Sequence, residues 1–286
     1  MSALPLGAAD SRLHVLAGEL RKVPAFIRRD FLVAWSYRIV FFSDLVNLTG
    51  QVLLFAFVGK MVDPSTLPTY NGSEVTYLEF ASIGIALAVF VQFGLTRVGS
   101  AVRGEQLMGT LESVLMTPTA PTTVQLGSVA FDLVYIPIRT ALFLGLTAVF
   151  FGLHFSPSGA LASALILVAF IPFVWGLGVA AGATVLTIRR GGGMVGFGVL
   201  ALGFASGIYF PVELLPGWVE ATADFNPIAL AIEGIREALL GTATARDTVG
   251  ILAVLVPLSL GALALGLVTF RLALRRERRR GTLGLY

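Results

Sequence analysis

The chain has 286 residues, of which 56% are apolar and only 13% are charged. Soluble domains average about 45–50% apolar and about 25% charged residues, and a soluble globule cannot hide so much apolar surface. The composition therefore indicates a membrane protein and argues against a disordered chain or a coiled coil. The chain has no cysteine and only two histidines, His14 and His154. This excludes disulfides, a thiolate zinc site and a cysteine nucleophile, and it disfavours a histidine metal centre.

The first predicted element is an amphipathic helix over residues 10–31. Apolar residues recur there at intervals of three and four, and basic residues fill the other faces. Such a helix suits either the inner membrane interface or the cytoplasmic side of the protein itself, and both placements stay open. The first thirty residues also lack the uninterrupted apolar core of a signal peptide, so we expect the N-terminus to be retained.

Six windows are long and apolar enough to cross a membrane, because a spanning helix needs about 20 mostly apolar residues. The windows are residues 39–59, 79–97, 123–153, 159–188, 193–211 and 248–270. We therefore predict an all-α membrane protein with six transmembrane helices, which together form a single transmembrane domain over residues 1–286.

The basic residues predict the orientation of these spans. Most of the 20 lysines and arginines lie before the first window, in the connections after the second and fourth windows, and in the tail. Because cytoplasmic loops are rich in lysine and arginine, both termini are expected in the cytoplasm. The pI of about 9.5 is then mainly a signal of topology, and we expect membrane lipid rather than nucleic acid as a partner.

Polar side chains inside the predicted spans are suspects for function, because a charge at the bilayer centre is costly. Asp44, Asn47 and Gln51 share one face of the first span, where they either line a substrate path or form a hydrogen-bonded seam with a neighbouring helix. Asp132 and Arg139 lie two turns apart on one side of the third span. We expect this pair to hold the bundle together, with a gating role as the less favoured alternative. Spaced glycines predict close helix packing, and the pairs are Gly178/Gly182, Gly192/Gly196 and Gly203/Gly207.

The longest cytoplasmic connection, residues 99–118, contains a short predicted helix. Thr110 is a suitable N-cap, and Pro118 stops the helix beyond Thr117. The apolar face consists of Leu111, Val114 and Leu115. Glu112 lies near the positive end of this helix. A capped helix with an apolar face in the cytoplasm is expected to dock on another surface.

A proline-rich outer segment, residues 211–241, separates the last two spans. Asn226-Pro227 predicts a helix start, because asparagine caps a helix and proline suits its first turn. Residues 228–240 are amphipathic, and Gly241 predicts the end of the helix. The polar face carries Glu233, Arg236 and Glu237. On the residues alone, a helix lying on the membrane is as acceptable as one that enters it.

Two groups of residues resemble the sequence motifs of the type-2 ABC transporter permease family, whose members are the membrane subunits of drug, lipid and polysaccharide exporters. The first group is Arg103-Gly104-Glu105, Gly109-Thr110-Leu111-Glu112 and Leu115-Met116-Thr117-Pro118. The second is Ser206-Gly207-Ile208-Tyr209-Phe210-Pro211-Val212-Glu213-Leu214-Leu215-Pro216, followed by Asn226-Pro227 and Arg236. Span count, topology and both motifs fall in the family's order, so the resemblance covers nearly the whole chain.

The resemblance implies a role for each segment. Residues 104–118 would form the coupling element on a nucleotide-binding subunit, and the implied contact residues are Arg103, Glu105, Thr110, Leu111, Glu112, Leu115 and Pro118. Glu112 and Arg103 are the favoured polar contacts, against the alternative that they only cap or solvate the loop. Residues 211–241 would form two short helices that re-enter the outer leaflet as an external gate, built from Pro211, Glu213, Pro216, Asn226, Pro227 and Arg236.

The sequence lacks an ATPase of its own. It contains no P-loop of the form G-x-x-x-x-G-K-[ST], so ATP and Mg²⁺ are expected on a separate ATPase chain, and this chain is predicted to carry no catalytic, cofactor or metal site. We predict the permease subunit of an ATP-driven exporter of a drug, lipid or lipid-linked glycan in a prokaryotic cytoplasmic (inner) membrane. Two ATPase copies and a second permease, identical or related, would complete it. The alternatives are an ion-coupled secondary transporter and an intramembrane lipid-modifying enzyme.

Overall fold

A computed structural model describes residues 23–36, 38–63, 67–70, 72, 74–107, 121–187, 192–223, 225–241 and 243–280. Within these residues the regular secondary structure consists of helices, with no strand among the elements. The longer ones are α2 (Val23–Ser36), α3 (Arg38–Gly59), α4 (Tyr77–Leu107), α6 (Pro121–Phe151), α7 (Ala160–Thr187), α8 (Gly192–Phe204), α10 (Pro227–Leu240) and α11 (Ala245–Arg280). The short ones are η2 (Pro157–Gly159), η3 (Val212–Leu214) and α9 (Gly217–Ala223). The all-helical class predicted from the sequence is confirmed for this part of the chain.

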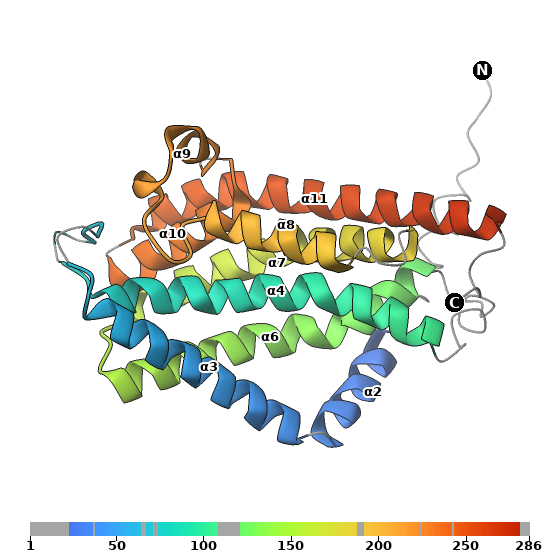
Figure 1. The fold of residues 1–286 in the computed structure, drawn as a ribbon, viewed down its shortest axis with the longest axis horizontal. Helices are drawn as coiled ribbons and strands as arrows, with labels where there is room; N and C mark the ends of the chain where they lie inside the picture. The colour runs from blue at the N-terminus through green and yellow to red at the C-terminus, as the bar shows by residue number, and fades with distance from the viewer. Residues whose placement is uncertain are drawn as a thin grey trace.

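The body of the molecule is a bundle in which α4, α6, α7, α8 and α11 run side by side along the long axis (Figure 1). α3 crosses the flank of the bundle at an angle, and α2 packs across α6 at one end. α10 lies at the opposite end, beside the starts of α4 and α7, and α9 stands outside it. We call this the α10 end.

Three of the described helices are long and apolar enough to cross a membrane. Their apolar stretches are Tyr77–Thr96, Pro157–Thr184 and Ala245–Glu277. α8 is shorter than the predicted span 193–211, because it ends at Phe204 and the chain turns at Gly207, whose φ is +69°. Its 13 residues cover about 20 Å, less than the hydrocarbon core of about 30 Å.

Two predicted boundaries differ from the helices that form. α4 continues to Leu107, so residues 99–107 of the predicted coupling loop are the last turns of a helix, and residues 108–118 lie outside the described residues. α11 runs on to Arg280, so the basic tail that follows the predicted span 248–270 is helical. Of the predicted interface helix 10–31, the described part belongs to α2, and Pro24 lies in its first turn, where proline is tolerated.

The core is formed mainly by residues of α4 and α7 and by the residues that pack against these two helices. One buried apolar cluster joins α4, α7, α10 and α11, with Leu87, Phe90, Ile166, Phe170 and Leu255 among its members. A second cluster lies between α3, α4 and α6, with Val52, Phe80, Ile85 and Phe143. α7 therefore contacts α4, α10 and α11, which fixes the α10 end to the bundle.

α7 and α11 form the most extensive contact between two elements, and their backbones touch. A Cβ atom built on Gly266 would lie 2.2 Å from the Gly176 carbonyl oxygen, and one on Gly176 would lie 2.4 Å from the Ala262 backbone. Small residues permit such contact between helices in membranes. The glycine pair Gly203/Gly207, predicted to pack on another helix, instead faces the turn after α8, through Ile208 and Val212.

Candidate functional site

α10 is the centre of the polar arrangement at the α10 end, and it is more deeply buried than its sequence pattern predicted. Nine of its residues are buried, including the predicted apolar face of Ile228, Ile232, Ile235 and Leu239. The assignment of Arg236 to a polar outer face was wrong, because Arg236 is 2% exposed. α10 packs against α7, α11 and α4, and the side of the helix that carries Arg236 is covered by α4.

The guanidinium of Arg236 is bound mainly by backbone carbonyls from two other segments. Its Nε and Nη2 donate to the Phe80 carbonyl at 3.3 and 3.2 Å, and Nη2 donates to the Gly207 and Ile208 carbonyls at 2.9 and 3.2 Å. The group also stacks 3.5 Å from the centre of the Phe80 ring. A buried cation is costly unless hydrogen-bonded, and these contacts compensate it while tying α10 to α4 and to the turn after α8.

A glycine on α4 makes room for this contact. A Cβ atom on Gly84 would lie 2.0 Å from the Ile208 carbonyl oxygen and 3.0 Å from Arg236 Nη2. The turn after α8 therefore rests on the bare backbone of α4. The signal in the sequence was the glycine itself, which sequence reasoning passed over because no spaced partner accompanies it.

Glu233 and Tyr70 flank the arginine on its more exposed side. Tyr70 Oη donates to Glu233 Oε1 at 2.8 Å, and Arg236 Nη1 lies 3.6 Å from Glu233 Oε2. Burial, followed by the nearby Glu233 carboxylate, raises the pKa of Tyr70 above its ordinary value. Tyr70 is therefore a hydrogen-bond donor at any physiological pH, and it links the loop before α4 to α10. Sequence reasoning missed Tyr70, which no motif marks.

A cavity of about 510 Å³ lies between α10 and the segment 211–223, which contains η3 and α9. We call this segment the flap. The cavity is lined on the flap side by Pro211, Glu213, Gly217 and Glu220, and on the other side by Phe80, Ser206, Leu230, Glu233 and Arg236. A mixed apolar and acidic lining of this kind suits an amphipathic molecule better than a purely polar one.

A second hollow of about 540 Å³ adjoins it at Glu233. Its lining includes Tyr70, Glu237 and Asp247. The pKa of Glu237 is raised, first by burial and then by the carboxylates of Glu233 and Asp247. Within the described residues, no three histidine or acidic side chains come together as a metal site.

The predicted helix start at Asn226-Pro227 is confirmed. Asn226 Oδ1 accepts from the Ile228 amide at 3.0 Å, and Pro227 opens α10. The same side chain has a second contact, since Asn226 Nδ2 donates to Ser206 Oγ at 2.9 Å. Residues 206 and 226 are thus joined at the base of the flap. Pro211 precedes η3, and Pro216 precedes α9.

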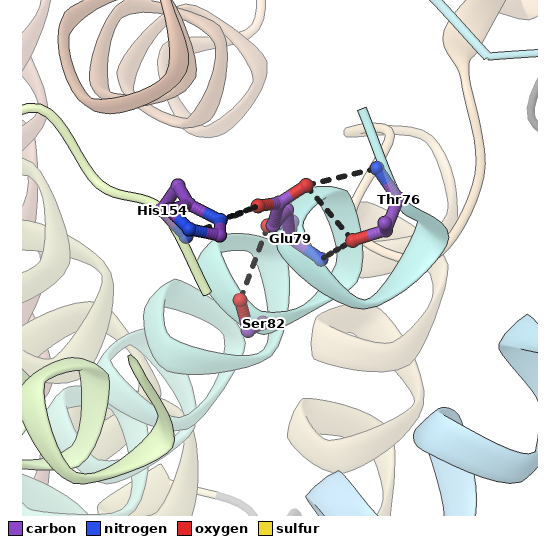
Figure 2. Close-up of polar contacts among 4 residues, drawn as sticks. All are labelled: Thr76, Glu79, Ser82 and His154. Atoms are coloured by element: carbon purple, nitrogen blue, oxygen red, sulfur yellow. Dashed lines mark hydrogen bonds and ion pairs between the residues drawn. The ribbon is translucent and has the colours of Figure 1, made fainter. Parts of the chain in front are cut away.

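The start of α4 is held by a polar cluster that sequence reasoning also missed. Figure 2 shows Glu79 accepting from the Thr76 amide and hydroxyl at 2.9 and 2.8 Å, while the Glu79 amide donates back to Thr76 Oγ1. The other Glu79 oxygen accepts from the His154 amide at 3.1 Å. This is a capping box, and Thr76-x-x-Glu79 is its sequence signal. Thr244 and Asp247 form the same arrangement at the start of α11.

The polar residues predicted inside the spans are only partly placed. Gln51 Nε2 donates to Asn47 Oδ1 at 3.4 Å on α3, and the side chain of Asp44 lies outside the described set. Arg139 is buried, with its guanidinium 4.7 Å from the Phe93 ring of α4. Arg139 thus contacts a neighbouring helix, while the side chain of Asp132 is not among those described.

The predicted coupling residues lie at the end of the bundle remote from α10, or beyond it in sequence. Arg103 and Glu105 belong to the last turns of α4, although their side chains are outside the described set. The others lie outside the described residues altogether, namely Thr110, Leu111, Glu112, Leu115 and Pro118.

Comparison with known proteins places these features in a family. The family model described as "ABC-2 type transporter" matches residues 21–240. A putative transport permease, ycf38, from Porphyra purpurea is 27% identical over 229 residues, which cover 76% of this chain and 73% of the relative. The matched range includes both the coupling segment and the outer segment on which the resemblance was based. The chain belongs to the ABC-2 type transporter family and is a multi-pass membrane transport permease.

Proposed function

We propose that this chain is the transmembrane half of an ATP-driven exporter, working with a separate ATPase chain. The observation that carries the proposal is the family match, which extends from residue 21 to residue 240 and so includes residues 104–118 and the flap. Family membership implies an ABC ATPase subunit. Since the sequence has no P-loop, ATP and Mg²⁺ are bound by that subunit, and this chain performs no covalent chemistry.

The geometry of α4 supports a coupling role for the segment that follows it. The apolar stretch of α4 ends at Thr96, and the helix continues to Leu107. Those extra turns extend about 16 Å along the axis, which takes the chain well past the apolar layer before residue 108. A short element carried there is suitably placed to receive a push from a soluble ATPase, provided that this end faces the cytoplasm.

The remaining parts of the proposal concern assembly and cargo. One permease chain supplies half of a path, so two permease copies, identical or related, act with two ATPase subunits in a prokaryotic cytoplasmic membrane, with both termini inside. The cargo is an amphipathic or hydrophobic molecule, such as a drug, a lipid or a lipid-linked glycan. The apolar and acidic lining of the cavity beside α10 supports cargo of that kind.

Affinity purification from native membranes in mild detergent tests the partner. We expect a P-loop ATPase to be retained, with Glu112→Ala weakening its retention and the matched carboxylate change at the other end, Glu220→Ala, leaving it unchanged. Purification of the wild-type chain without any ATPase would refute the proposal. Transport in proteoliposomes then tests the energy source, because export driven by an ion gradient without ATP would instead identify a secondary transporter.

A further inference from the structure

The cavity at the α10 end has two unlike walls. The flap, residues 211–223, forms one wall, and α10 with Phe80 and Ser206 forms the other. Figure 1 shows α9 standing clear of the bundle while α10 lies along it. The two walls therefore differ in how firmly the rest of the molecule holds them.

α10 is anchored in its middle and at its C-terminal end. In the middle, Arg236 donates to three carbonyls of α4 and of the turn after α8. Near the end, the Ser156 amide donates to the Leu239 carbonyl at 2.7 Å, and Gly159 lies so close that its Cβ atom would meet the Ala238 carbonyl oxygen at 1.7 Å. Displacing α10 would break buried charge-assisted hydrogen bonds, which are the strong ones.

The flap is shaped by short-range hydrogen bonds. The Leu214 amide donates to the Pro211 carbonyl, the Leu215 amide to the Val212 carbonyl and the Val219 amide to the Pro216 carbonyl, at 3.2, 2.9 and 2.7 Å. η3 contains no buried residue, and Leu214 and Trp218 are 64% and 77% exposed, although Pro211 and Val219 are buried. Segments with few buried contacts open at low free energy.

The residues that flank the flap on either side, Ser206 and Asn226, are joined by a hydrogen bond. Ser206 is buried, and its hydroxyl accepts from Asn226 at 2.9 Å, while Asn226 also caps α10. A movement of residues 211–223 about this base leaves the contacts of Arg236 intact. Movement of α10 does not.

We propose that Arg236 is a positioning residue that fixes α10 as the floor of the cavity, so that the flap opens and closes over it alone. The inference rests on the proposed export function, because an exporter has to open this end to the outside. It goes beyond that function by dividing the external gate into one moving part, the flap, and one stationary part, α10.

Hydrogen–deuterium exchange of the complex with its ATPase tests the division. Amides of the flap and of α10 (228–240) are followed in the nucleotide-free state and after trapping with ATP and vanadate. We expect the exchange of the flap to change between the states by about tenfold or more, while that of α10 stays slow in both. An equal or larger change in α10, or an unchanged flap in a complex that traps nucleotide, would overturn the inference.

Arg236→Lys separates positioning from a general contribution to stability. The lysine keeps the charge but loses the planar fork of donors, so the state-dependent change should spread into 228–240 by about threefold or more. The matched control Arg246→Lys, at an exposed arginine, should leave the change confined to the flap. A residue with only a structural role would accelerate exchange of α10 equally in both states, and that result would refute the assignment.

A second variant covers the case in which Arg236→Lys does not fold. Gly84→Ala pushes the Ile208 carbonyl away from the arginine, whereas Gly50→Ala adds a methyl group where nothing lies within 4 Å. Gly84→Ala should loosen α10, and behaviour identical to that of Gly50→Ala would overturn the inference. If no ATPase binds this chain, the proposed function fails. The wild-type permease alone still tests the fixed floor, because equal exchange in the flap and in α10 would contradict it.

Discussion

The contact between α7 and α11 gives a prediction whose size follows from the structure. Replacing Gly266 by alanine places a Cβ atom 2.2 Å from the Gly176 carbonyl oxygen, whereas ordinary contact begins at 3.4 Å. The obstacle is backbone, which cannot rotate aside as a flexible side chain does. The two helices therefore have to separate locally by about 1.2 Å, the difference between those distances, and lose packing along their shared seam.

The control for this change lies on the same helix. Gly261→Ala adds the same methyl group to α11 where nothing lies within 4 Å. Both variants gain about 0.5–1 kcal/mol from replacing a helical glycine, so that term cancels in the comparison. Overpacking costs about 1–3 kcal/mol, and Gly266→Ala should be less stable than Gly261→Ala by that amount.

Thermal unfolding of the two variants in detergent, followed by tryptophan fluorescence, measures the difference. About 2–4 °C of Tm accompanies each kcal/mol in a chain near this size, so we expect a gap of about 2–12 °C. The double change Gly176→Ala with Gly266→Ala should cost less than the sum of the single changes, because both part the same backbones. Equal Tm values for Gly266→Ala and Gly261→Ala would refute the packing argument.

Four further changes, two of them a pair, test the α10 end by thermal unfolding. Tyr70→Phe keeps the ring but removes the hydroxyl that donates to Glu233 at 2.8 Å, so it should lower the free energy of unfolding by about 1 kcal/mol. Glu233→Gln changes the acceptor of the same hydrogen bond. An unchanged stability in Tyr70→Phe would contradict a contribution from this bond. Asn226→Ala removes both the cap of α10 and the contact with Ser206, so it should cost about 1–2 kcal/mol, more than a cap alone if the flap base matters. Glu237→Gln should raise Tm by about 1–2 °C at pH 7–8. The pKa of Glu237 is raised in the folded protein, so ionisation of this carboxyl lowers the stability once the pH exceeds the ordinary pKa of a glutamate. The advantage should vanish toward pH 4, where the carboxyl is protonated in both states, and an advantage that persists there would refute the cause.

The parts of the fold that follow from local pattern could be predicted from the sequence. The start of α10 followed from Asn226-Pro227, and its buried face from the spacing of four apolar residues. Apolar length gave α3, α6 and α7 to within two residues of their predicted windows. These features depend on neighbours in the chain, which a sequence displays.

The parts that depend on packing could not be predicted. Arg236 has the spacing of a wet helix face, but α4 and the turn after α8 cover it. The end of α8 at Phe204 comes from a turn at Gly207, in a stretch where apolar residues resume at Ile208 and so favour a longer predicted span. The closest helix contact, Gly176 with Gly266, joins residues 90 positions apart, so no short glycine motif announces it.

The burial of Arg236 among carbonyls means that its closest contacts do not depend on the acidic residues around it. Its nearest partners are carbonyl oxygens at 2.9–3.3 Å, while the Glu233 carboxylate lies farther away at 3.6 Å. Carbonyls do not titrate, and arginine stays protonated at any physiological pH. The contacts of Arg236 with the carbonyls are therefore independent of pH, whereas Glu233 lines the cavity beside Arg236 and Glu237 lines the adjoining hollow. Because the carbonyl contacts of Arg236 do not involve these carboxylates, replacing Glu237 by glutamine leaves that anchor of α10 in place, while the bond from Tyr70 to Glu233 contributes separately.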